Sequence, residues 1–169
     1  MYVIGATVIE EVPADLEDGI NYISDDSVAL VLTAPGKDNA FVLGDFNDWS
    51  ISDEGYMKQT PSGEKFWLGI GGLTAGQEYR FQYLVDGNIR IGDPYCEKVL
   101  DPWNDQYISE DTYPGLIAYP EGQTSGLVSV LQTDEPEYQW TVTDFERPAK
   151  EDLVIYELLM RDFLDTHHY

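Results

Sequence analysis

The chain has 169 residues and a formal net charge of −23, from 32 acidic and 9 basic side chains. This charge argues against nucleic acid as a partner and against an anionic membrane surface, because both would be repelled. Hydrophobic residues make up 43% of the chain, a globular profile, and no apolar run is long enough for membrane insertion.

Short runs of β-prone residues, separated by Gly, Pro and Asp turn signals, follow one another along most of the chain. Strands are predicted at residues 20–23, 28–33, 40–43, 66–70, 79–85, 88–91 and 127–133. Within 79–85 the larger apolar side chains alternate with Arg80 and Gln82, which predicts one face toward a core. Asp86-Gly87 predicts a tight hairpin, since both central positions of that turn favour positive φ. The pattern indicates an all-β, immunoglobulin-like antiparallel β-sandwich over residues 1–134.

The end of the chain has a different character. Residues 92–125 are rich in loops, and residues 135–152 form a polar linker. Leu153–Met160 is apolar at nearly every position, which suits a strand buried on both faces of a parallel sheet. A C-terminal helix packed on the sandwich is the alternative, because short apolar runs do not separate strand from helix.

The stretch after the third predicted strand combines turn-forming polar residues with two aromatics. Gly44 ends the strand, Asp45 and Asn47 favour turns, and Phe46 is expected to tuck beneath the loop. Trp49 has two readings. Its indole could stack on the C–H face of a sugar whose hydroxyls bond the nearby amides and carboxylates, or it could close one end of the hydrophobic core.

Metal, cofactor and disulfide chemistry find little support in the sequence. Cys96 is the one cysteine, so no internal disulfide can form. His167 and His168 would point to opposite faces of an extended chain and lack a third ligand. The Asp45-Asn47-Asp48 spacing resembles the start of a calcium loop, but the later bidentate Glu is missing. We expect no metal, no cofactor and no catalytic residue in this chain.

Two stretches together resemble the alpha-amylase superfamily of glycoside hydrolases. Gly44–Trp49, Phe81–Gly87 and Asp93-Pro94 are similar to the N-terminal sandwich of these enzymes and to the related glycogen-binding (isoamylase-N-type) modules. Val154–Glu157 through Arg161–Phe163 resembles the first strand of their catalytic (β/α)₈ barrel. Asp101–Asn104 fits the connector, and residues 1–26 carry no part of the resemblance.

The resemblance implies an enzyme acting on α-glucans such as starch or glycogen, with the sandwich as an accessory module. Residues 153–169 would then begin a truncated catalytic barrel. The family carries its catalytic carboxylates on later barrel strands, so neither Glu157 nor Asp162 matches one, and this chain alone is expected to be inactive. Its partners would be the barrel of the intact protein and an α-glucan, with a possible dimer through residues 153–163.

Glycogen-binding relatives use an aromatic at the position of Trp49, a basic residue on the following strand and a second aromatic after the hairpin. Gln82 stands at the basic position and Ile89 near the second aromatic, so two of the three features are absent. Any sugar site is therefore expected to be weak, and its candidate contacts are Trp49, Asn47, Trp67 and Gln82. Tyr95, Trp103 and Tyr107 are secondary candidates, for which core or loop packing is the alternative use.

Three hypotheses stay open: the front part of a glucan-processing enzyme, a stand-alone carbohydrate-binding module with a weak site at Trp49, and a structural sandwich without a sugar partner. No signal-peptide pattern follows Met1, which leaves the compartment open. It would be extracellular or periplasmic if a signal peptide was removed, and cytoplasmic otherwise.

Overall fold

The computed structural model describes residues 5–158 of the chain. These residues fold into strands and short 3₁₀ turns, without an α-helix. One compact unit comprises residues 1–107 with 117–135, and a second comprises residues 108–116 with 136–169. His167 and His168, at which the sequence predicts no metal site, lie outside the described residues. Within residues 5–158 no helix has the length and apolarity that crossing a membrane requires.

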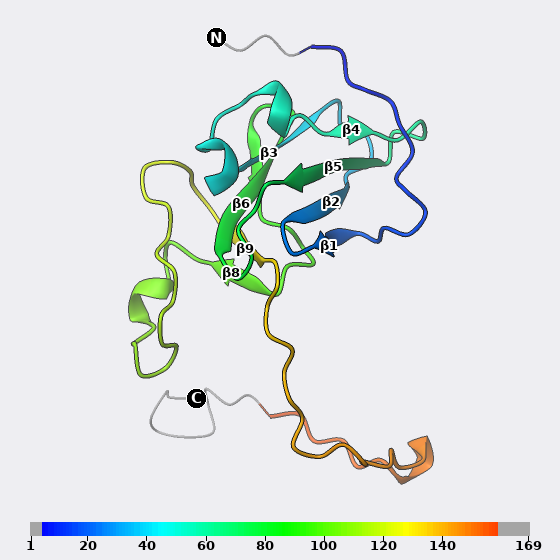
Figure 1. The fold of residues 1–169 in the computed structure, drawn as a ribbon, viewed down its shortest axis with the longest axis vertical. Coiled ribbons are helices and arrows are strands. Elements are labelled where there is room, and N and C mark those ends of the chain that lie inside the picture. The colour runs from blue at the N-terminus through cyan, green and yellow to red at the C-terminus, as the bar shows by residue number, and fades with distance from the viewer. Residues whose placement is uncertain (1–4, 159–169) are drawn as a thin grey trace. The chain divides into compact units, whose positions relative to one another are not determined.

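Two antiparallel sheets form the first unit (Figure 1). One sheet has the order β1 (Gly19–Ser24), β2 (Ser27–Thr33), β5 (Lys65–Gly71), β4 (Lys58–Gln59). The other has the order β3 (Ala40–Gly44), β6 (Glu78–Val85), β9 (Val128–Gln132), β8 (Lys98–Leu100), and β7 (Ile89–Ile91) pairs with β6.

The strand order is that of an immunoglobulin-type sandwich. If β1 to β6 are read as strands A to F and β9 as G, the sheets have the orders A-B-E-D and C-F-G. The predicted all-β antiparallel sandwich is confirmed. Sequence analysis missed β4 and β8, which have two and three residues, and placed β8 inside a loop-rich segment.

The core lies between the sheets and draws on both. Tyr79, Phe81, Tyr83 and Val85 of β6 pack into one buried cluster with side chains of β2, β3, β5 and β9. The predicted inward face of β6 is therefore confirmed. At the hairpin, Asp86 and Gly87 have φ of 50° and 70°, which confirms the predicted turn.

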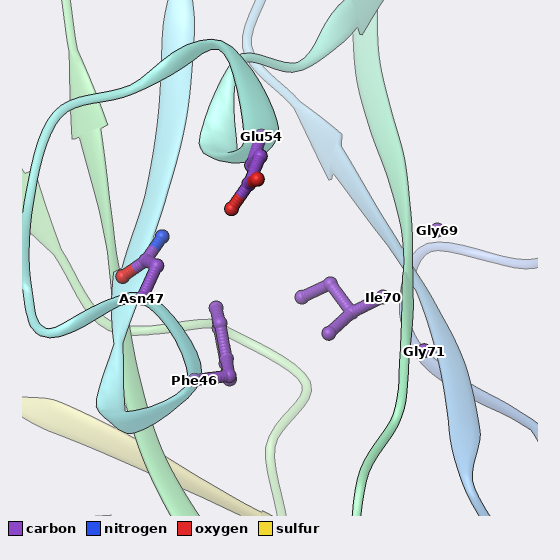
Figure 2. Close-up of a pocket in the computed structure, with 6 residues that line it drawn as sticks. All are labelled: Phe46, Asn47, Glu54, Gly69, Ile70 and Gly71. Carbon is purple, nitrogen blue, oxygen red and sulfur yellow. The ribbon is translucent and has the colours of Figure 1, made fainter.

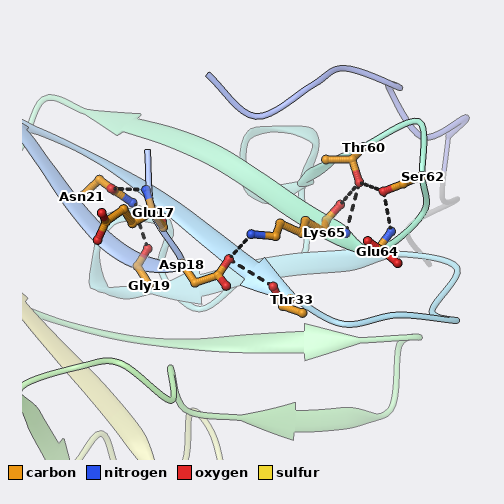
Figure 3. Close-up of polar contacts among 9 residues, drawn as sticks. All are labelled: Glu17, Asp18, Gly19, Asn21, Thr33, Thr60, Ser62, Glu64 and Lys65. Atoms are coloured by element: carbon orange, nitrogen blue, oxygen red, sulfur yellow. Dashed lines mark hydrogen bonds and ion pairs between the residues drawn. The ribbon is translucent and has the colours of Figure 1, made fainter. Parts of the chain in front are cut away.

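Polar contacts secure the entry of β1 to the rest of its sheet (Figure 3). Asp18, which precedes β1, accepts hydrogen bonds from Lys65 Nζ at 2.7 Å and Thr33 Oγ1 at 3.0 Å. The hydrogen bond from Lys65 lowers the pKa of Asp18, and the bond from Thr33 acts in the same direction. Asp18 thereby links the segment before β1 to the last residue of β2 and the first residue of β5.

The described part of the second unit exposes its apolar side chains. Val154, Ile155 and Tyr156 are 96%, 87% and 80% exposed, and residues 153–158 contain no strand. The strand predicted for Leu153–Met160 was assigned to a parallel sheet that the described residues do not contain, and its last two residues lie outside them. The barrel assignment of residues 153–169 stays a prediction.

The buried Tyr83 hydroxyl offers a test of the sandwich core. It donates to Asp93 Oδ2 at 2.7 Å, and both residues are at most 4% exposed. Tyr83→Phe should lower the free energy of unfolding by about 1–3 kcal/mol, because one oxygen of a buried carboxylate loses its donor. Urea unfolding would measure this loss. Tyr107→Phe, at an 80% exposed position, is the control, with an expected change within about 0.5 kcal/mol. Equal free energies of unfolding for the two variants would contradict a stabilising role of the Tyr83 hydroxyl.

Candidate functional site

The loop that follows β3 is built tightly around a glycine. A Cβ on Gly44 would lie 2.6 Å from the carbonyl oxygen of Arg80 and 2.9 Å from the ring of Phe46, so only glycine fits. The 3₁₀ turn Asp45–Asn47 starts immediately after it. Asn47 holds the turn, because its Oδ1 accepts from Gly44 N and its Nδ2 donates to the Val42 carbonyl, both at 2.9 Å.

Asp45 is the electrostatic centre of this loop. Its Oδ2 accepts from the backbone N and the Nε of Arg80, both at 2.8 Å. Its Oδ1 accepts from Arg80 Nη2 at 2.9 Å and from Trp49 Nε1 at 3.1 Å. Burial acts to raise the pKa of Asp45, but the hydrogen bonds from Arg80 and Trp49 outweigh burial and lower it.

Trp49 is held against the protein by this arrangement. Its indole N–H is bonded to Asp45, its backbone N donates to the Gly44 carbonyl at 3.0 Å, and 8% of the residue is exposed. Phe46 packs against the core cluster, as the sequence predicted. The position of Trp49 agrees with the reading in which it closes the end of the core.

Gln82 faces away from the core and is nevertheless fully buried. Its Nε2 donates to the carbonyls of Ser125 at 2.9 Å and Leu127 at 2.8 Å, and its Oε1 accepts from Thr124 Oγ1. Arg80 makes a further contact with the same segment, since its Nη1 donates to the Ala118 carbonyl at 2.8 Å. Residues 117–127 are therefore fastened over the outer side of β6, and we call this segment the strap.

Trp67 belongs to the other sheet. It is 8% exposed, its Nε1 donates to the Glu10 carbonyl at 3.1 Å, and Lys58 Nζ lies 4.1 Å from the ring centroid. Of the four predicted sugar contacts, the structure places Asn47 and Trp49 on one loop, Gln82 under the strap and Trp67 on β5. Their assignment to sugar binding stays a prediction.

The three secondary candidates are more open to solvent. Tyr95, Trp103 and Tyr107 are 61%, 62% and 80% exposed. Asp101 orders the turn that carries the last two, accepting from Trp103 N at 2.8 Å and from Asn104 Nδ2 at 2.6 Å. The Asn104 side chain, followed by the Trp103 backbone, lowers the pKa of Asp101.

A pocket of about 240 Å³ opens beside the loop, lined by Phe46, Asn47, Glu54, Gly69, Ile70 and Gly71. Figure 2 shows Phe46 and Ile70 facing each other across it, with the Glu54 side chain directed into the space from the 3₁₀ turn Asp53–Gly55. Sequence analysis missed this pocket, as it missed the roles of Asp45 and Arg80. Arg80 carried a signal, being a charged residue on the outward face of a predicted strand.

Among residues 5–158 no group of three or more His, Cys, Asp or Glu side chains is placed to hold a metal ion. Asp45, one of the residues considered for calcium, bonds to Arg80 and Trp49 instead. Cys96 is a free, partly buried cysteine, and burial raises the pKa of its thiol.

Comparison with known proteins gives structural similarities at low identity. No family model matches the chain, and no curated protein matches it by sequence. One similar structure is a candidate alpha-amylase from Salmonella typhimurium, with a TM-score of 0.37 and 22% identity. That match covers 47% of this chain and 12% of the other. The TM-score is too low for the match to assign a function.

A second similar structure is the catalytic module of SpuA, a glycogen-degrading virulence factor from pneumococcus. Its TM-score is 0.48 at 22% identity, and the match covers 88% of this chain and 21% of the other. The chain thus spans about a fifth or less of the length of both structures. This TM-score, too, is too low for the match to assign a function.

The Asp45 carboxylate can be tested without changing the shape of the loop. Asp45→Asn should cost about 1–3 kcal/mol of unfolding free energy at neutral pH, because charge-assisted bonds become neutral ones. The folded pKa of Asp45 lies below its unfolded value, so its stabilisation is present above about pH 4 and is lost as the pH falls through the folded pKa.

Urea unfolding of wild type and Asp45→Asn across this range would therefore show their difference shrink on acidification. Asp48→Asn is the matched control on the same loop, since its side chain is exposed and forms no hydrogen bond with another side chain among residues 5–158, and Asn tolerates its φ of 51°. A difference that stays constant from pH 7 to pH 2 would contradict the role given to Asp45.

Proposed function

We propose that this chain is the N-terminal part of an alpha-amylase-family enzyme that acts on α-glucans. Its sandwich is an accessory, glycogen-binding-type module that packs beside the catalytic barrel of the intact protein. The observation that carries the proposal is the Gly44–Trp49 motif, whose residues form one interlocked loop at the end of β3. The barrel-like sequence from Val154 to Phe163 follows this motif along the chain, in the order that the family resemblance predicts.

The exposure of the second unit supports this assignment. Apolar side chains at residues 153–156 are 49% to 96% exposed, and the contact of so many apolar groups with water is unfavourable. The first strand of a parallel barrel would be covered on both faces by the rest of that barrel. The catalytic carboxylates would lie on those later strands.

The accessory role, rather than a stand-alone binding module, is favoured by the state of Trp49 and Gln82. A sugar platform needs an accessible aromatic face, and Trp49 is 8% exposed with its N–H already bonded. The side chain of Gln82 is covered by the strap. The module therefore supplies a rigid body rather than an open glucan groove on this face.

The native reading frame beyond Tyr169 tests the proposal most simply. It should encode further barrel strands that carry the acidic residues of the family, and the intact protein should cleave or transfer α-glucosidic bonds in glycogen or starch. A frame that ends soon after Tyr169, or continues without such strands, would overturn the enzymatic proposal.

Titration of the chain with maltoheptaose separates the alternative, a binding module centred on Trp49. In calorimetry, wild type and Trp49→Leu should show the same weak or negligible binding of maltoheptaose, because the indole is not available for stacking. Loss of a true platform would cost on the order of 1 kcal/mol, or about fivefold in affinity. Thermal unfolding checks that the variant is folded, and Trp103→Leu serves as the exposed control. A fivefold weakening confined to Trp49→Leu would favour the stand-alone module.

A further inference from the structure

The pocket beside the loop has a chemical character that the proposed function does not use. Its two side walls are apolar, because Phe46 and Ile70 face each other across it and both pack against the core. Phe46 is held in place, since its ring lies against the backbone of Gly44. A ligand entering the pocket would therefore meet a fixed aromatic ring on one side and an aliphatic side chain on the other.

Glu54 brings a negative charge beside these two apolar side chains, in a pocket whose lining also includes the backbone of Gly69 and Gly71. Its side chain points into the pocket, and no described residue donates it a hydrogen bond or forms an ion pair with it. The other polar side chain of the lining, Asn47, is already bonded to backbone atoms through both its oxygen and its nitrogen. Glu54 is thus the one lining side chain left with unused bonding capacity.

No basic side chain in the described part of the sandwich is paired with this carboxylate. All six basic side chains of the sandwich are engaged elsewhere: Lys37 with Asp86, Lys58 with Glu10, Lys65 with Asp18, Lys98 with Glu78, Arg80 with Asp45, and Arg90 with Thr124. Glu54 is exposed to solvent, and a cation that pairs with it in the pocket would come from outside the sandwich. The net charge of −23 favours the approach of cations in general.

We propose that this pocket binds a primary alkylammonium group, of the kind that a lysine side chain carries. Its methylene stem lies between Phe46 and Ile70, and its ammonium group pairs with Glu54 near the aromatic face. Long basic side chains combine an apolar stem with a charged head in this way, and aromatic rings attract cations. The volume of about 240 Å³ is below the usual range for drug-sized ligands and suits a short chain.

Other ligand classes fit the lining less well. An anion would be repelled by Glu54. A divalent metal needs several oxygen ligands, and the pocket offers one carboxylate. A neutral sugar ring presents several hydroxyls that require partners, whereas Asn47 is already bonded on both sides.

Titration of the ¹⁵N-labelled chain with n-butylammonium chloride, followed by NMR, tests the proposal. The amide signals of Gly69 and Gly71 should shift saturably in the millimolar range, and the affinity should fall as NaCl is added. n-Butanol, which has the same stem without the charge, should bind at least threefold more weakly. A second titration uses Nα-acetyl-lysine methylamide, which represents a lysine side chain within a polypeptide, whereas n-butylammonium represents a free alkylamine. Binding of either amine supports the proposal.

Glu54→Gln supplies the deciding variant. It should weaken butylammonium binding about three- to tenfold, because an exposed ion pair contributes of the order of 1 kcal/mol. Glu64→Gln removes the same charge in the turn before β5 and should leave the affinity unchanged. Equal effects of the two substitutions would overturn the proposal, as would the absence of saturable shifts. Shifts produced by maltose but not by the amines would overturn it in favour of a sugar site.

Discussion

The ion pair between Asp45 and Arg80 holds the loop after β3, with Trp49, against β6. Both side chains are largely covered, at 19% and 22% exposure, and two bonds join the carboxylate to the guanidinium. A third bond comes from the Arg80 backbone. Because Asp45 follows β3 and Arg80 lies on β6, the pair fixes the end of one strand on its neighbour. Partners this well covered are costly to separate.

Two further features depend on this pair. Asp45 also takes the indole N–H of Trp49, so the loop cannot turn the ring outward without breaking a bond to a charged acceptor. Arg80 reaches the Ala118 carbonyl, so the strap over Gln82 is anchored by the same guanidinium. The region around Trp49 and Gln82, which sequence analysis considered for sugar binding, is consequently closed by side-chain and backbone bonds. This closure is the physical reason for proposing an accessory rather than a binding role.

Sequence reasoning succeeded where local patterns determine structure. The alternation in residues 79–85 predicted which side of β6 packs inward, and Asp86-Gly87 predicted its hairpin turn. It failed for β4 and β8, because strands of two and three residues carry too little periodicity to be recognised. Trp49 stayed ambiguous, since the sequence shows an aromatic in a polar loop but not that Asp45 binds its N–H.

The pocket and the strap were missed for a different reason. Phe46, Glu54 and Ile70 come from three separate elements, and only the folded chain brings them around one space. Gln82 was read as outward-facing from the alternation of its strand, which is correct relative to the core. That residues 124–127 return to cover it is a long-range contact without a local signal.

The central claim is that Trp49 is a locked structural element and not an open platform. Hydrogen exchange of the four indole N–H groups, followed by NMR, tests it directly. The account predicts slow exchange for Trp49 and Trp67, whose N–H groups are bonded and whose residues are 8% exposed, and fast exchange for the exposed Trp103 and Trp140. Exchange of the Trp49 indole at the rate of Trp103 would contradict the account.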